Sequence, residues 1–192
     1  ITASDGVNNT LQEITINVSD INEAPEFSSS LTFDVEENII TVGNVTASDP
    51  EEDGLTFSIG NKFQITSNGL VTFKVIPNYE TKSSYTSTIK IFDGVHEVVE
   101  ELKVNVIDVN ELPAFTSSAI FTVEENQKSI GTIIVIDEDG DELAYTISGN
   151  EINISSGGVI SFISTPDYET KSSYSELVTV NDGTNTLSQS IT

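Results

Sequence analysis

Short runs in which apolar and polar residues alternate recur along the chain. Residues 31–35 (Leu-Thr-Phe-Asp-Val) and 102–106 (Leu-Lys-Val-Asn-Val) are two of them. A period of two puts alternate side chains on opposite faces of a β-strand, so that one face can pack into a core while the other faces solvent. No segment has the period of an amphipathic helix. The pattern therefore predicts an all-β protein built from half-buried strands.

Between residues 24 and 108 the pattern predicts about seven short strands. Turn-forming pairs such as Asn68-Gly69 and Asp93-Gly94 separate neighbouring strands. Such a series within about 88 residues is typical of an Ig-like β-sandwich with Greek-key connections, and a barrel is the alternative. The expected strands lie near residues 30–36, 43–48, 55–60, 63–66, 70–75, 85–92 and 97–107.

The chain contains an internal repeat. The segment 79–85 (Tyr-Glu-Thr-Lys-Ser-Ser-Tyr) recurs unchanged at 168–174. Other matched positions give a period of about 88 residues, which grows by one residue beyond Leu143. The added residue falls between Leu143 and Gly158, and such an insertion is typical of a surface loop.

An Asp-Gly pair marks the same late point in three repeats, at Asp5, Asp93 and Asp182. The expected divisions are residues 1–20 as the C-terminal strands of a preceding repeat, residues 24–108 as a complete repeat, and residues 112–192 as a repeat lacking its last strand. An isolated repeat tail has an unpaired edge. We therefore expect the first 20 residues to be disordered, swapped, or supplying a missing strand elsewhere.

Composition adds a strong negative charge. The chain has 31 acidic and 7 basic residues, which gives a formal net charge of −24. Nucleic acid and anionic membranes carry the same sign of charge, so we expect neither as a partner. Divalent cations are the favoured partners, and a merely solubilising acidic surface is the alternative.

Cysteine, methionine and tryptophan are absent. Without cysteine, no disulfide can form and no thiolate is available for zinc binding or nucleophilic chemistry. No apolar run approaches the length of a membrane span, and no basic start precedes an apolar stretch. We therefore expect neither a membrane-inserted helix nor a signal peptide in this segment.

The acidic residues fall into five short motifs that recur in order. They are Glu-Glu-Asn, Asp-x-(Asp/Glu), (Asp/Asn)-Tyr-Glu, Asp-Gly, and Asp-x-Asn-Glu at the junction between repeats. This set resembles the cadherin repeat, in the divergent form found in large bacterial adhesins of the RTX type, and the resemblance covers essentially the whole chain. It implies tandem sandwiches with a calcium cluster at each junction. Calcium suits such motifs because it takes about 6–8 oxygen ligands in irregular geometry.

For the junction that is complete in this chain, the resemblance implies ligands from the upstream repeat, the linker and the downstream repeat. These residues are Glu37, Asn78 and Glu80 upstream, Asp108, Asn110 and Glu111 in the linker, and Asp137, Asp139 and Asp182 downstream. The linker also offers a backbone carbonyl near Val109 or Leu112. Asn78 and Glu111 depart from the usual family residues, so the number of ions is left at two or three.

Two further junctions are incomplete in this chain. The earlier one would use Asp20, Asn22 and Glu23 of its linker with Asp49, Glu51 and Asp93 of the following repeat. Glu51 replaces the second aspartate of its pair. The later junction would use Glu125, Asp167 and Glu169. We expect the ligand sets of both incomplete junctions to be empty or weakly occupied.

The resemblance implies a calcium-rigidified stalk of an extracellular cell-adhesion protein, at the cell surface or secreted. Its partners would be calcium ions and neighbouring repeats, and a cell-surface glycan or protein ligand is left open. A carbohydrate-binding or homophilic adhesion module on the same scaffold is the alternative. We do not expect an enzyme, because His96 is the only histidine and the acids are explained by the repeated motifs. We expect His96 to be a solvent-facing strand residue.

Overall fold

The computed structural model describes residues 1–192, and every regular element in it is a β-strand. The chain divides into two compact units. The first comprises Ile1–Val35, Ile39–Ile76 and Ser84–Asn105, and the second comprises Glu36–Asn38, Pro77–Ser83 and Val106–Thr192. A long apolar helix of the kind that crosses a membrane is not found in either unit.

A short hairpin opens the first unit. β1 (Thr2–Ser4) pairs antiparallel with β2 (Asn9–Leu11) and with no other strand. The turn between them is held by Asp5, whose Oδ1 accepts the backbone N–H of Val7 at 2.9 Å. All side chains from residue 1 to residue 21 are exposed. The hairpin therefore forms by local pairing alone and contributes nothing to a buried core.

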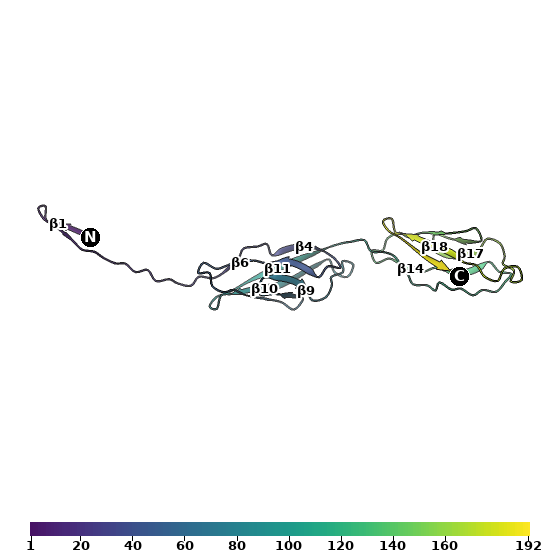
Figure 1. The fold of residues 1–192 in the computed structure, drawn as a ribbon, viewed down its shortest axis with the longest axis horizontal. Coiled ribbons are helices and arrows are strands. Elements are labelled where there is room, and N and C mark those ends of the chain that lie inside the picture. The colour runs from purple at the N-terminus through teal and green to yellow at the C-terminus, as the bar shows by residue number, and fades with distance from the viewer. The chain divides into compact units, whose positions relative to one another are not determined.

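The first sandwich is built from strands β3 to β11. Its larger sheet has the order β4-β11-β10-β7, a second sheet has the order β5-β9-β8, and β3 pairs with β6. Figure 1 shows β4, β10 and β11 running alongside one another. The strands are β3 (Glu26–Phe27), β4 (Thr32–Glu36), β5 (Thr41–Asn44), β6 (Ala47–Ser48), β7 (Thr56–Ile59), β8 (Phe63–Ile65), β9 (Leu70–Phe73), β10 (Ser84–Phe92) and β11 (Glu97–Ile107). The predicted all-β sandwich is confirmed.

Two details differ from the predicted strands. The expected strand at 43–48 is two strands, β5 in one sheet and β6 in another. The pairing of β5 with β9 shifts register between Thr41 and Gly43, and a bulge of this kind bends a strand and lets the chain pass between sheets. β3 was not predicted, because its two residues are too few for alternation to be visible.

The core of the first sandwich lies between its two main sheets. The side chains of Val71 and Phe73 on β9 and of Ile89 and Ile91 on β10 are all buried. Phe73 also packs edge-on against Tyr85, with ring centroids 5.1 Å apart. Alternate residues of β10 are buried, as the period-two pattern predicts.

The second sandwich repeats this plan with strands β12 to β19. Its sheets have the orders β15-β18-β19, β13-β17-β16 and β12-β14. A single buried cluster that includes Ile160, Val178 and Val180 forms its core. The strands are β12 (Ala114–Phe115), β13 (Ser129–Thr132), β14 (Val135–Ile136), β15 (Ala144–Ile147), β16 (Ile152–Ile154), β17 (Val159–Phe162), β18 (Glu176–Asn181) and β19 (Thr186–Ile191).

One turn in each sandwich requires glycine. Gly69 has φ of 84° and Gly158 has φ of 76°, a left-handed conformation that side-chain-bearing residues rarely adopt. A Cβ atom at Gly69 would collide with the backbone carbonyl of Val45, and one at Gly158 would collide with that of Ile133. Each glycine therefore lets two backbone segments approach closely at a corner of its sandwich.

Gly69→Ala should destabilise the protein by about 2–4 kcal/mol, because it combines backbone strain with a backbone collision that no side-chain movement can relieve. Denaturant unfolding monitored by circular dichroism measures the change. Gly54→Ala is the matched control, since a Cβ there meets nothing within 4 Å, and it should change stability by less than about 0.5 kcal/mol. Equal effects of the two substitutions would contradict this role of Gly69.

Candidate metal centre

The candidate site begins with a buried glutamate. Glu37 follows β4 and is only 1% exposed. Its Oε2 accepts the backbone N–H of Tyr79 at 2.8 Å, and its Oε1 accepts the backbone N–H of Val109 at 3.0 Å. One carboxylate thus fixes the loop that carries Glu80 and the linker that carries Asp108.

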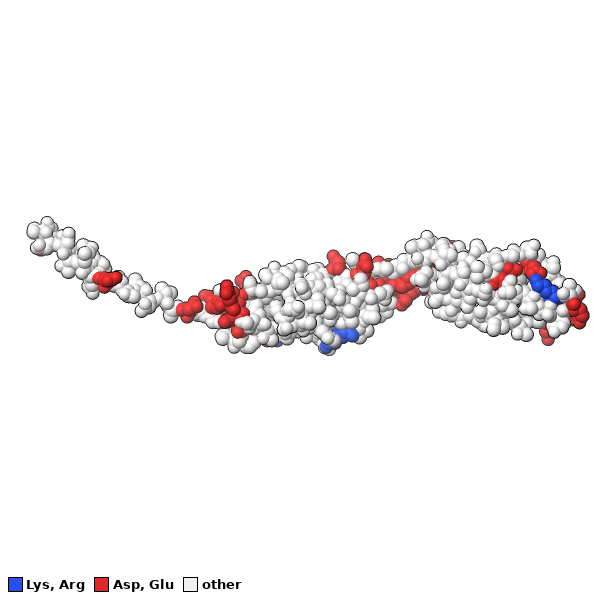
Figure 2. All heavy atoms as spheres, in the orientation of Figure 1, with Lys and Arg blue, Asp and Glu red and all other residues white.

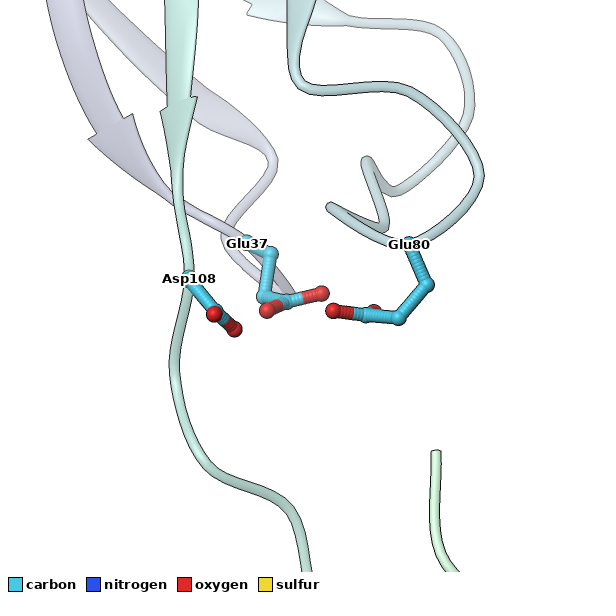
Figure 3. A group of neighbouring side chains, drawn as sticks. All are labelled: Glu37, Glu80 and Asp108. Carbon is cyan, nitrogen blue, oxygen red and sulfur yellow. The ribbon is translucent and has the colours of Figure 1, made fainter. Parts of the chain in front are cut away.

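These bonds bring three carboxylates together. Glu37, Glu80 and Asp108 each offer an oxygen atom, and the three atoms lie within 4.8 Å of one another. Figure 3 shows the side chains converging from three separate segments of the chain, with their carboxylates directed toward one another. Asp108 follows β11 directly, so the strand positions it from one side.

Two further groups continue the cluster. The first is Glu80, Glu111 and Asp139, and the second is Asp137, Asp139 and Asp141, with ligand atoms within 4.8 Å in each. Glu80 and Asp139 each belong to two groups, so seven carboxylates form one connected series. The backbone N–H of Glu111 donates to Asp139 Oδ2 at 2.8 Å and holds the linker against this part of the site. Figure 2 shows that acidic side chains gather in patches while basic ones are few.

The electrostatics of the series are unfavourable for the protein alone. Burial and the charge of Asp139 raise the pKa of Asp108, and burial and the charge of Glu37 raise the pKa of Glu111. Burial and the charges of Asp137 and Asp139 raise the pKa of Asp141. None of the three ion pairs in the structure involves these groups. Mutual repulsion between carboxylates is therefore not relieved by a protein cation.

The donor set fits calcium. Glu111 Oε2, Asp137 Oδ2 and Asp139 Oδ1 are buried oxygen atoms with no hydrogen-bond partner. Unpartnered buried polar atoms are uncommon and call for an explanation such as an ion. All the atoms that converge are carboxylate oxygens, which suit a hard cation of irregular coordination better than zinc or copper. We therefore regard the series as a candidate calcium site.

Three further predicted ligands make hydrogen bonds around the series. Asn78 Oδ1 accepts the backbone N–H of Thr81 at 2.7 Å, and its Nδ2 donates to Glu138 at 2.6 Å. Asn110 donates to Asp182 Oδ2 at 3.2 Å. Asn78, Asn110 and Asp182 thus hold a loop and the linker in place, and their binding of an ion stays a prediction.

Asp182 is a buried turn residue. Its Oδ1 accepts the backbone N–H groups of Thr184 and Asn185. Burial raises its pKa, but these hydrogen bonds and those from the Asn110 and Asn185 side chains outweigh burial and leave the pKa lowered. Its charge is thus stabilised by local donors.

Asp141 is a group member that sequence reasoning did not select. It lies in the same acidic turn as Asp137 and Asp139, and its backbone N–H donates to Asp137 Oδ1 at 3.1 Å. Gly140, with φ of 77°, turns the chain so that residues on both sides of it face the same point. The close spacing of three aspartates around a glycine was the available signal.

The linker at residues 20–23 repeats part of this arrangement within the first unit. Asn22 donates to Asp93 Oδ2 at 2.9 Å, and the backbone N–H of Glu23 donates to Glu51 Oε2 at 3.1 Å. Asp49 Oδ2 is buried without a partner. Asp20 is exposed and joins no group. Five of the six residues predicted for this incomplete junction therefore lie around the docked linker.

His96 also belongs to this arrangement. Its Nδ1 lies 3.3 Å from Asp93 Oδ2 and 2.9 Å from Asn22 Nδ2. The expectation of a strand residue is wrong, because His96 lies in the turn before β11, and its side chain is 42% exposed. Hydrogen bonds from the backbone N–H groups of Val95 and His96 outweigh the opposing effect of burial and lower the pKa of Asp93. The buried carboxylate of Asp93 therefore stabilises its turn, as the carboxylate of Asp182 does.

The third predicted set is present as a group. Glu125, Asp167 and Glu169 offer oxygen atoms within 4.8 Å of one another, and all three residues are exposed. The backbone N–H of Tyr168 donates to Glu125 Oε2 at 3.0 Å, as that of Tyr79 does to Glu37. The repeated motif thus forms the same local geometry twice.

No protein-family model matches the chain. Human protocadherin-15 is 33% identical over 167 residues, which cover 77% of this chain and 8% of that much longer protein. The crystal structure of human protocadherin-24 EC1-2 matches with a TM-score of 0.58 at 21% identity, over 88% of this chain and 94% of that one. Drosophila N-cadherin EC1-4 matches with a TM-score of 0.59 at 17% identity, over 88% of this chain and 48% of that one.

At these sequence identities the structural similarity establishes the fold. This fold is the one that the order of the acidic motifs along the chain implied. The β-strand arrangement and the resemblance to cadherin ectodomains lead to the same conclusion. Both sandwiches of this protein have the fold of cadherin ectodomain structures.

Proposed function

We propose that the chain is a calcium-binding stalk segment of an extracellular cell-adhesion protein. The observation that carries the proposal is the connected series of seven carboxylates, which has buried unpartnered oxygens and no neighbouring cation. The similarity to a relative named protocadherin-15 supports an adhesive role outside the cell. The chain covers only 8% of that relative. The proposal therefore names no particular adhesive ligand for the whole protein.

Individual residues would have distinct tasks in this function. Glu37 would hold the loop and the linker through its two backbone hydrogen bonds while its charge contributes to the ion site. Glu80 and Asp139 would bridge, because each belongs to two groups. Bound calcium would supply the positive charge that lets these carboxylates stay ionised and close together. The number of ions is proposed as two or three.

The consequence for the linker is mechanical. Residues 108–112 contain no regular strand. They are held by Glu37 and Asp139 of the carboxylate series and by Asp182 beside it. Without cations, repulsion among the same carboxylates opposes this attachment. Occupied sites would therefore restrict the linker, which suits a stalk that keeps an adhesive region away from the cell.

The other functions weighed on the sequence lack a supporting observation. A carbohydrate platform usually needs exposed aromatic surface. The chain has no tryptophan, and its exposed tyrosines Tyr79 and Tyr168 lie at matched positions of the repeat, in the loops held by Glu37 and Glu125. Its single histidine holds a turn at Asp93, and no nucleophile is paired with it. The relatives named above are animal proteins, so an origin in a bacterial RTX-type adhesin stays a prediction, and so does homophilic adhesion.

Calcium should raise the melting temperature, because it binds the folded arrangement and not the unfolded chain. At 100 times the dissociation constant, one site adds about 2.7 kcal/mol. Asp139→Asn should remove at least half of this gain, since Asp139 belongs to two groups. Differential scanning calorimetry in millimolar calcium and in excess chelator measures both effects.

Asp34→Asn is the matched control for this experiment. It removes one negative charge from an exposed strand position outside every carboxylate group, and it should leave the calcium response unchanged. Small-angle scattering on the same samples tests whether the particle is stiffer in calcium. Identical melting profiles with and without calcium would overturn the proposed function.

The pH dependence in calcium-depleted buffer should be the reverse of the usual behaviour for acids. The raised pKa values of Asp108, Glu111 and Asp141 mean that the folded state disfavours their ionised forms. Their contribution to stability is therefore complete below the unfolded values of 3.8 for aspartate and 4.5 for glutamate, and it is lost as the pH rises through the folded values. Melting temperature should fall as the pH rises from about 4.5 to 7.

Four groups with lowered pKa values, among them Asp93 and Asp182, act in the opposite sense. The lowered pKa values of Asp93 and Asp182 stabilise the fold above 3.8 and lose that effect at lower pH, outside the proposed range of measurement. General surface repulsion also contributes to the slope, so the diagnostic is a difference between variants. Asp108→Asn with Glu111→Gln should flatten the slope, and Asp34→Asn with Glu100→Gln should not. Equal slopes in the two double variants would refute the assignment.

A further inference from the structure

One corner of the first sandwich combines apolar and basic side chains. The backbone N–H of Phe73, at the end of β9, donates to Ile40 O at 2.8 Å, and that of Lys74 donates to Lys62 O at 3.1 Å. These bonds put residues 39–40 on one side of the segment 73–76 and residue 62 on the other. The basic-apolar patch is the name used below for Ile39, Ile40, Lys62, Lys74, Val75 and Ile76.

The apolar members of the patch are open to solvent. Val75 is 79% exposed and Ile76 is 58% exposed, while Ile39 and Ile40 are 44% and 46% exposed. A single exposed apolar side chain is ordinary on a protein surface. Four large ones on two adjacent segments form a continuous apolar surface, and such surfaces mark sites where another molecule binds.

The two lysines of the patch repel each other. Lys62 and Lys74 lie next to the cross-strand pair of Phe63 and Phe73, and like charges at facing positions of neighbouring strands are destabilising. Neither lysine belongs to an ion pair, although the chain has 31 acidic residues against 7 basic ones. A carboxylate placed between the two ammonium groups would remove this repulsion.

The second sandwich makes the same backbone bonds with different side chains. The backbone N–H of Phe162 donates to Lys128 O at 2.8 Å, and that of Ile163 donates to Glu151 O at 2.8 Å. The chain path at this corner therefore does not require the basic-apolar patch. The residues that match the patch are mostly polar: Gln127, Lys128, Glu151, Ile163, Ser164 and Thr165.

Charge also differs between the two matched corners. In the second sandwich Glu151 forms an ion pair with Lys171. The first sandwich has lysine at both matched positions, Lys62 and Lys82. The second corner thus balances its charge internally, whereas the first has an excess of positive charge on a chain whose net charge is −24. This excess is suited to a ligand that brings its own carboxylates.

We propose that the basic-apolar patch binds a protein partner through a segment in which apolar side chains are flanked by aspartate or glutamate. The apolar side chains would cover Val75 and Ile76, and a carboxylate would lie between Lys62 and Lys74, where charge-assisted hydrogen bonds form. An anionic membrane fits less well, because it would extend past the patch to acidic surface that it repels. A short segment contacts the patch alone.

Selection of short random peptides displayed on phage, with the whole chain as bait in millimolar calcium, tests the proposal. The enriched peptides should combine apolar residues with aspartate or glutamate. As synthetic peptides they should bind with a dissociation constant of about 10 μM to 1 mM, as expected for a contact well below the size of a standard interface. They should shift the amide resonances of residues 39–41, 62–64 and 73–76.

Two variants that borrow residues from the second sandwich separate the apolar and the charged contribution. Val75→Ser with Ile76→Thr should raise the dissociation constant of the selected peptides at least about tenfold, because it removes the apolar contact. Lys62→Glu should raise it at least about fivefold, because it sets a carboxylate against the carboxylates of the peptide. Calorimetric melting of each variant checks that the fold is intact.

Matched controls change the same kinds of residue elsewhere on the first sandwich. Val95→Ser alters an apolar residue that is 68% exposed, and Lys103→Glu alters an exposed lysine of β11 that forms no ion pair. Both should leave peptide binding unchanged. The proposal is overturned if no peptide is enriched, if the enriched peptides lack acids, or if the patch variants bind them as well as the controls do.

Two further measurements test other occupants of the patch. Binding to vesicles of phosphatidylcholine and phosphatidylserine that is lost in Val75→Ser with Ile76→Thr would assign the patch to a membrane and overturn a protein partner. Self-association in sedimentation velocity that the same variant abolishes would assign it to a second copy, with the same consequence. Peptide binding is measured apart from the calcium-dependent melting that depends on Asp139, so either result can fail while the other stands.

Discussion

Repulsion among carboxylates is the constraint on which the rest of this structure depends. The fold brings Glu37, Glu80, Asp108 and four further acids into one connected series, although like charges at such short distances repel one another. The β-sandwich tolerates this because the attachments are made by backbone N–H groups, as at Val109 and Glu111. A rigid scaffold with neutral donors thus holds together charges that would otherwise separate.

Much of the fold was predictable because the strand pattern is local. Alternation located the main strands, and the left-handed turn at Gly69 was visible as Asn68-Gly69. The division of 43–48 into β5 and β6 was not predictable, because the bulge near Gly43 depends on pairing with β9. Local sequence decides which residues alternate, but the partner strand decides where a strand bends.

The candidate site was predictable as a set of motifs, and which of their residues bind an ion stays a prediction. Glu37, Glu80 and Asp108 converge, whereas Asn78, Asn110 and Asp182 hold loops and the linker. A side chain that donates to a neighbouring backbone or carboxylate cannot be told from a ligand by its position in a motif. Asp141 was overlooked because the turn at Gly140, which directs it toward Asp137, is a three-dimensional feature. Identical segments also differ in exposure, as Tyr79 and Tyr168 do, which shows that burial depends on neighbours.

Glu80 and Asp139 each belong to two of the carboxylate groups, and shared members have a thermodynamic consequence. An ion that fixes Glu80 in one group also orders a ligand of the next, so part of the entropic cost of the second binding event has already been met. If the proposed calcium sites are linked in this way, they would fill cooperatively. The linker would then respond to calcium over a narrow range of concentration, as a threshold device instead of a graded one.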